Sequence, residues 1–119
     1  MVALRLTVLV VGHTQCGGAK AALKAVTGPP PEVEPVLLRW LTPLVELADR
    51  LNLKSVPYDE ALTQLIEESV REQVRNVANS EPVRKAWEGG RKNLWVHGLV
   101  YELETGLLRD LNVTKGPQS

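Results

Sequence analysis

The chain has 119 residues, of which 44% are hydrophobic and 24% charged, so it has the size and composition of one globular domain over residues 1–119. Lysine plus arginine and aspartate plus glutamate number 14 each, and this zero net charge argues against a nucleic-acid partner. No apolar run approaches the roughly 20 residues that span a bilayer, and no secretory signal is recognisable. The single cysteine excludes an internal disulfide and fits a reducing compartment, so we expect a cytoplasmic protein without a membrane partner.

The first predicted element is a strand. The apolar, β-branched run Thr7–Val11 lacks polar alternation, which is typical of a strand buried on both faces, as in parallel sheets. A loop over Gly12–Gly18 follows, and the composition of Ala19–Val26 predicts a helix. The proline-rich segment Thr27–Pro31 ends that helix in a predicted surface loop.

Further helices are predicted in the middle of the chain. Apolar residues recur at helical spacing from Val36 to Leu51 and again within Asp59–Asn79, where Asp59 is the expected N-cap. A short helix should run from an N-cap at Ser80 to Trp87. The predicted apolar face of the second helix comprises Leu37, Leu38, Leu41, Leu44, Val45, Ala48 and Leu51. The predicted buried stripe of the third comprises Leu62, Leu65, Ile66, Ser69, Val70, Gln73, Val74 and Val77.

The chain closes with β-structure. Leu94–Leu103 predicts a long strand, Glu104–Gly106 a turn, and Leu107–Leu111 an antiparallel returning strand. The polar tail from Thr114 is expected to fray. This order of elements indicates an α/β layered domain with a mixed sheet, in which the first strand lies parallel beside the long one.

Candidate chemistry concentrates in the loop after the first strand. His13 and Cys16 are three residues apart, and imidazole nitrogen and thiolate sulfur are preferred zinc ligands. Cys16 precedes a helix, whose positive N-terminus favours a thiolate, and Gly17 and Gly18 leave backbone N–H groups open to an anion.

The residues alone leave other readings of this loop open. Cys16 could be core filler beneath a loop whose His13 bonds to backbone, or it could be a nucleophile with a histidine base. The only other histidine, His97, lies inside a predicted strand, where a structural role is expected.

The stretch Val10–Leu23 resembles the second zinc-binding motif of β-class carbonic anhydrases. There a strand ends in Gly-His-(Ser/Thr)-x-Cys-Gly-Gly, and the following helix often contains Ala-Ala-Leu. The resemblance is to the microbial and fungal subgroup, and it continues in order through Trp40–Leu44, Val70–Val77, Val83–Trp87 and Val96–Leu108.

The resemblance implies a β-carbonic anhydrase-like α/β fold with a mixed sheet flanked by helices. It also implies one zinc ion as cofactor, carbon dioxide and bicarbonate as substrates, and reversible hydration as the reaction. His13 and Cys16 would be ligands of the metal, with Gly17 and Gly18 as their loop neighbours.

One part of the family pattern is absent. The family has an earlier strand ending in Cys-x-Asp-Ser-Arg, whose Cys binds zinc and whose Asp–Arg pair lies beside the metal-bound water. This sequence has no Asp-Ser-Arg, and Cys16 is its only cysteine. We therefore expect a truncated sheet without the first family strands, and weak or lost activity. We also expect a homodimer or higher homo-oligomer, because an apolar sheet edge is left bare.

Three possibilities for the zinc site remain open. A carboxylate or His97 could add a ligand, a second copy could contribute its own pair, or the metal could bind weakly or not at all. The alternative function is a non-catalytic metal-binding or assembly module on the same scaffold.

Overall fold

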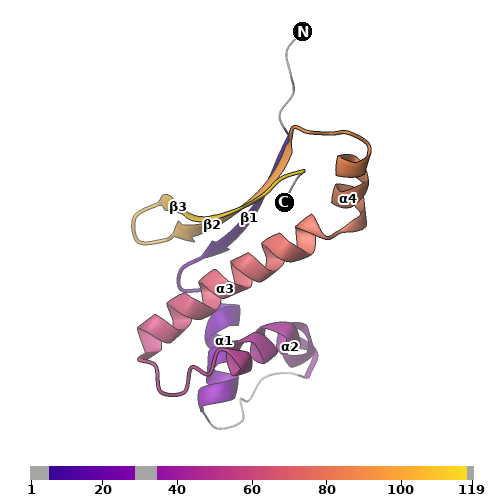
Figure 1. Cartoon of the computed structure of the whole chain (residues 1–119). Helices are drawn as coiled ribbons and strands as arrows, with labels where there is room; N and C mark the ends of the chain where they lie inside the picture. The colour runs from indigo at the N-terminus through magenta and orange to yellow at the C-terminus, as the bar shows by residue number, and fades with distance from the viewer. Residues whose placement is uncertain (1–5, 29–34, 118–119) are drawn as a thin grey trace.

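The structure is a computed structural model, and it describes residues 6–28 and 35–117. Along the chain lie β1 (Leu6–His13), α1 (Gly17–Thr27), α2 (Pro35–Arg50), α3 (Tyr58–Ala78), α4 (Glu81–Glu88), β2 (Leu94–Glu102) and β3 (Leu107–Lys115) (Figure 1). The predicted α/β order is confirmed. The predicted loop through Pro29–Pro31 lies outside the described residues.

The described strands form one mixed sheet in the order β1-β2-β3. β1 pairs in parallel with β2, with Leu9 opposite His97, and β2 pairs antiparallel with β3. Both predicted pairings are confirmed. As expected from sequence, β1 lies at an edge of the described sheet, and its eight residues carry neither a charge nor proline apart from the terminal His13.

Helix α3 covers one face of this sheet and contacts all three strands. Its apolar side chains meet the inward-facing residues of the strands, and Leu65, Val74, Val96 and Val100 are fully buried there. Glycine permits this close approach, because a Cβ on Gly98 would lie 2.7 Å from Val113 Cγ2 and 3.0 Å from the nearest side-chain atoms of two α3 valines.

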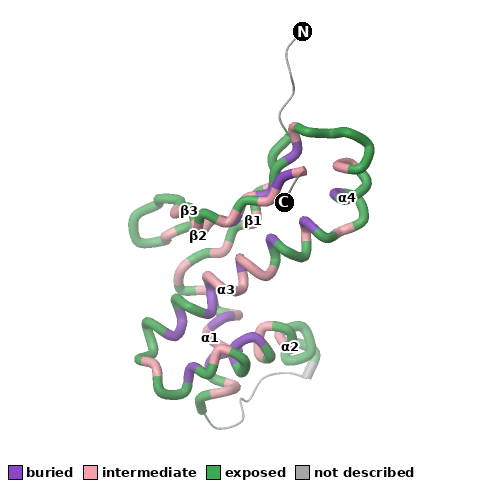
Figure 2. The backbone as a smooth tube through the Cα atoms, in the orientation of Figure 1, coloured by how far each residue is buried: buried purple, intermediate pink, exposed green. Residues whose placement is uncertain are grey.

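The opposite face of the sheet is exposed among the described residues. Burial alternates along β1 and β2 (Figure 2), and the outward residues Leu9, Val11 and Trp95 keep 51%, 49% and 41% of their surface accessible. The expectation that the first strand is buried on both faces is therefore wrong for the described chain. Helix α3 packs on one face only, so an all-apolar strand still alternates between buried and open positions.

Several predicted details need correction. Asp59 is not the N-cap of α3: the cap is Pro57, whose extended backbone leads straight into a helix that begins at Tyr58. Gln73 is exposed, because the part of α3 in which it lies faces solvent beside α2. Strand β3 continues to Lys115 past a register irregularity, with Asn112 at φ 58°, so Thr114 belongs to a strand and not to a frayed tail.

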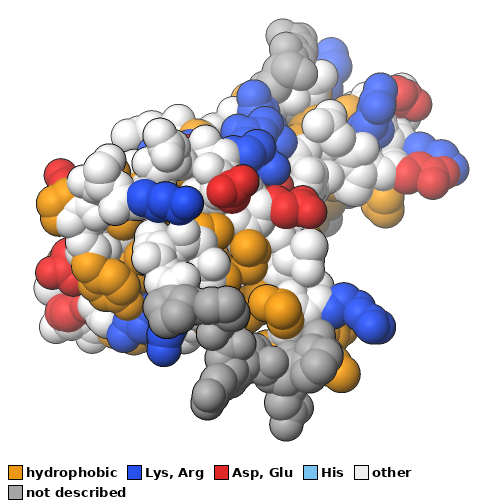
Figure 3. Space-filling view, turned by 90° about the horizontal axis from the view of Figure 1, so that it is seen from below, with side chains coloured by type: hydrophobic (Ala, Val, Ile, Leu, Met, Phe, Trp, Pro, Cys, Tyr) orange, Lys and Arg blue, Asp and Glu red, His pale blue; other side chains and the backbone are white. Residues whose placement is uncertain are grey.

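Hydrophobic side chains also gather at the end of the molecule that carries α2 (Figure 3). Val36, Leu37 and Leu38 are exposed there, and Trp40 keeps 80% of its surface accessible. Only the later residues of the predicted α2 face, with Ala48 the most deeply placed, pack into the core. No helix in the described ranges is long and apolar enough to cross a membrane.

Candidate metal-binding loop

The His13–Gly18 loop, by which we mean residues 13–18, joins the carboxyl end of β1 to the start of α1. Cys16 is the N-cap residue of α1, is partly buried, and accepts a hydrogen bond from the Lys20 N–H through its carbonyl. Helix α1 begins at Gly17, two residues earlier than predicted. A Cβ on Gly17 would meet nothing within 4 Å, so there is open space beside this residue.

The ring of His13 is exposed and is oriented by its neighbour. Nδ1 lies 2.9 Å from the carbonyl oxygen of Thr14. Because a carbonyl can only accept, Nδ1 carries the proton, and a neutral ring then has its lone pair on Nε2. Metal-binding histidines typically donate their second N–H in this way, so His13 is set up as an Nε2 donor.

Thr14 connects the loop to the turn between β2 and β3. Its hydroxyl accepts a hydrogen bond from the Leu103 N–H at 2.9 Å and donates one to Glu104 Oε2 at 3.0 Å. Its backbone N–H donates to the Tyr101 carbonyl at 3.0 Å, which extends the β1–β2 ladder by one residue. Gln15 then turns the chain through a left-handed conformation with φ 56°.

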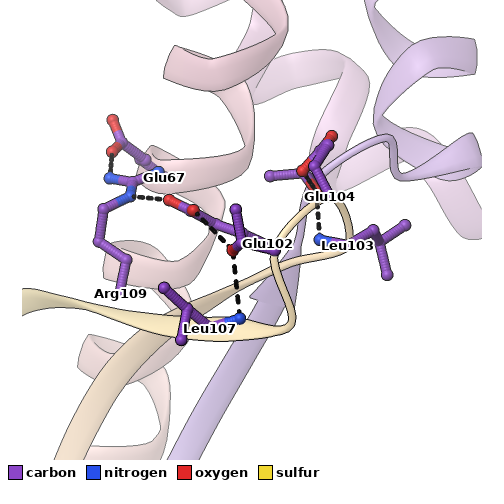
Figure 4. A network of polar contacts seen from close by, with 8 residues as sticks. Glu67, Glu102, Leu103, Glu104, Leu107 and Arg109 are labelled. Atoms are coloured by element: carbon purple, nitrogen blue, oxygen red, sulfur yellow. Dashed lines mark hydrogen bonds and ion pairs between the residues drawn. The ribbon is translucent and has the colours of Figure 1, made fainter.

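The turn itself is joined to α3 through charged side chains (Figure 4). Arg109 donates to Glu102 at 3.1 Å through Nε and to Glu67 of α3 through Nη1. These two carboxylates raise the pKa of Arg109, with Glu67 the larger cause. Hydrogen bonds from its own backbone N–H and then from the Thr14 hydroxyl lower the pKa of Glu104 below its ordinary value.

A pocket of about 230 Å³ lies beside the loop, on the side of α3. The loop contributes Thr14 and Gln15 to its wall, and the turn and β3 contribute Glu104 and Arg109. Neither His13 nor Cys16 lines it. The side chains of His13 and Cys16 therefore lie outside this pocket.

The donors on this loop fit zinc in kind but not in number. The described residues contain no group of three or more His, Cys, Asp and Glu side chains that could hold a metal ion. His97 does not complete the site: it pairs with Leu9, four residues before His13, which corresponds to about 13 Å along the strand. The Nδ1 atom of His97 lies 3.0 Å from the hydroxyl of Thr114 on β3, in keeping with the predicted structural role.

Sequence reasoning proposed His13 and Cys16 as donors but missed the residues that hold the loop. Nothing in local composition marks Thr14 as a partner of Leu103 and Glu104, because these contacts join segments about 90 residues apart in sequence. The only available signal was the topology: parallel pairing of the first strand with Leu94–Leu103 brings the two carboxyl ends together.

Comparison with known proteins shows similarity to carbonic anhydrases. Residues 4–108 match the family model of carbonic anhydrases. A carbonic anhydrase of Emericella nidulans is 32% identical over 109 residues, which are 89% of this chain and 45% of the relative.

Solved structures of β-carbonic anhydrases are also similar to this chain. A Coccomyxa β-carbonic anhydrase in complex with acetazolamide is 34% identical with a TM-score of 0.80, over 92% of this chain and 48% of that one. The β-carbonic anhydrase CafA of Aspergillus fumigatus is 33% identical with a TM-score of 0.74, over 89% and 48%.

The chain thus spans about half the length of the relatives that it matches. Within that half, both the sequence and the arrangement of strands and helices follow theirs. The chain belongs to the carbonic anhydrase family and has the fold of the β-class, of the microbial and fungal type.

Proposed function

We propose that this chain supplies one half of a zinc site that serves the reversible hydration of carbon dioxide to bicarbonate. The observation that carries the proposal is the His13–Gly18 loop of this carbonic anhydrase family member. The loop holds the His13 imidazole with its lone pair on Nε2, and three residues later the Cys16 thiol at the N-terminus of α1. His13 and Cys16 would hold the metal, and Gly17 and Gly18 would leave backbone N–H groups accessible beside it.

The chemistry that zinc supplies when bound in such a site is Lewis acidity, which lets water attack carbon dioxide at neutral pH. The part of the chain described here has two donors where catalytic zinc takes three from protein. We therefore propose that the further ligands come from another segment or a second copy of the chain, and that these residues by themselves hydrate carbon dioxide weakly or not at all.

Assembly is a second proposed role, favoured by the surface of the sheet. The uncharged run of β1 forms an edge of the sheet in the described part of the chain, and the face beside it exposes Leu9, Val11 and Trp95. Such edges and faces favour association. A β-carbonic anhydrase of Sordaria macrospora that shares the fold is tetrameric, and we propose that this chain also forms a homo-oligomer.

Zinc analysis and stopped-flow hydration on the same sample test the catalytic proposal. The two histidines offer a matched pair of variants: His13→Gln should lower zinc content together with any hydration, whereas His97→Gln should leave the zinc content unchanged. Cys16→Ser should abolish zinc binding. Zinc retained at the same stoichiometry in both His13→Gln and Cys16→Ser would show that the metal site lies elsewhere. Zinc binding without hydration would favour the assembly role.

A further inference from the structure

Thr14, one of the two residues between the donors His13 and Cys16, is held by hydrogen bonds from both its backbone and its side chain. Thr14 uses its backbone N–H, its carbonyl and both capacities of its hydroxyl in hydrogen bonds of 2.9–3.0 Å. The partners are Tyr101, Leu103 and Glu104 at the end of β2, and the ring of His13 itself.

Two partners of Thr14, Leu103 and Glu104, belong to the β2–β3 turn, which has hydrogen bonds of its own. The Gly106 N–H donates to the Glu102 carbonyl at 2.8 Å, and Gly106 has φ 72°, a conformation that suits glycine. Arg109 connects Glu102 to Glu67 on α3 (Figure 4). Ion pairs thus join α3 to Glu102, and hydrogen bonds join the next two residues of the chain, Leu103 and Glu104, to Thr14, whose carbonyl bonds to the His13 ring.

We propose that Thr14 is a positioning residue for the metal-binding loop: by bonding the loop to the β2–β3 turn, it sets the orientation of His13 and the path of the chain to Cys16. The inference rests on the proposed function of these two donors. Its physical basis is preorganisation, because a loop held in one conformation loses less entropy when a metal binds. Groups that orient a metal-binding histidine typically affect metal affinity by about 10–100-fold when removed.

The test compares Thr14→Val, which keeps the shape but removes both hydroxyl bonds, with Thr14→Ser, which restores them. Thr42→Val is the matched control, because the Thr42 hydroxyl donates to the Leu38 carbonyl within α2, away from the metal-binding loop. Glu104→Ala removes one partner at the surface and should fold even if Thr14→Val does not.

Two readouts are needed. The first is amide hydrogen exchange of Leu103, whose N–H donates to Thr14; it should be about tenfold faster in Thr14→Val, the effect of losing one hydrogen bond, and unchanged in Thr14→Ser and Thr42→Val. The second is titration with cobalt(II) alone, followed by the thiolate-to-cobalt charge-transfer band. Cobalt affinity should fall about 10-fold in Thr14→Val, which removes the two hydroxyl bonds of the loop but keeps the carbonyl bonded to His13, and Glu104→Ala should weaken it by about twofold to threefold.

Faster Leu103 exchange with unchanged cobalt affinity would overturn the positioning role, because the bonds would then be structural only. Unchanged exchange would overturn it as well. If the unmodified chain shows no cobalt–thiolate band, the proposed function fails. The positioning role is then decided by backbone order of residues 13–16 measured by NMR relaxation, which must decrease in Thr14→Val and recover in Thr14→Ser.

Discussion

Replacing Gly98 with alanine tests whether α3 packs on the sheet as closely as described. The added Cβ would lie 2.7 Å from Val113 Cγ2 and 3.0 Å from Val70 Cγ1 and Val74 Cγ2, well inside the normal carbon–carbon contact of about 3.5–4.0 Å. Valine side chains have few alternative rotamers, so the helix or β3 must move.

The expected cost can be worked out. Overpacking of this kind costs about 1–3 kcal/mol, and the lower flexibility of alanine in the unfolded chain offsets about 0.5–1 kcal/mol. The difference between these ranges is about 0–2.5 kcal/mol, and the expected net loss is its central part, about 1–2 kcal/mol. With an unfolding entropy of about 2.1 cal/mol/K per residue over 119 residues, the midpoint of thermal unfolding should fall by about 4–8 °C.

Circular dichroism during thermal unfolding measures this shift, and Gly17→Ala is the control. It adds the same methyl group where nothing lies within 4 Å, at the first position of α1, so its midpoint should equal or exceed that of the unmodified chain. Equal midpoints for Gly98→Ala and Gly17→Ala would refute the close packing of α3. Helix α3 also lies against Gly12, next to His13, so the position of α3 affects the end of β1.

Three further predictions concern charge and association. The pKa of Glu104 is lowered in the folded chain, so its stabilising contribution is present above the ordinary carboxyl pKa and is lost as pH falls through the lowered value; NMR titration should show this pKa rising in Thr14→Val. Arg109→Met should cost no more than about 1 kcal/mol in urea unfolding, because the side chain is 40% exposed, and the loss should shrink at high salt. Sedimentation should show at least a dimer at micromolar concentration and dissociation in Leu9→Lys; a monodisperse monomer of the unmodified chain would contradict the proposed assembly.

The arrangement of strands followed from local pattern and resemblance together. The apolar run ending at Gly12 indicated a parallel-type strand and the turn around Gly106 an antiparallel pair, because buried strands and tight turns have distinct compositions. Degree of burial was not predictable in this way. A run such as Leu9–Val11 is apolar whether both of its faces are covered or only one, and its exposure depends on what packs there.

For the candidate site, the sequence singles out two candidate donors but gives no sign of the residues that support them. His13 and Cys16 stand out because their chemistry is unusual for a loop. The hydroxyl of Thr14 gains meaning only from Leu103 and Glu104, which topology brings to it from the far end of the chain. The predicted N-cap of α3 was wrong for a related reason. Asp59 has a side chain typical of an N-cap, but the helix begins at Tyr58 and its N-cap is Pro57.

The most direct test of the central claim is X-ray absorption at the zinc edge on the metal-loaded chain. Cys16 is the only cysteine, so a sulfur neighbour at about 2.3 Å identifies it, and the number of sulfurs per zinc shows whether one copy or two share the ion. We predict at least one sulfur at that distance with nitrogen at about 2.0 Å, and loss of the sulfur in Cys16→Ser. Zinc bound by oxygen and nitrogen alone, with the Cys16 thiol still free to react with a thiol reagent, would contradict the assignment.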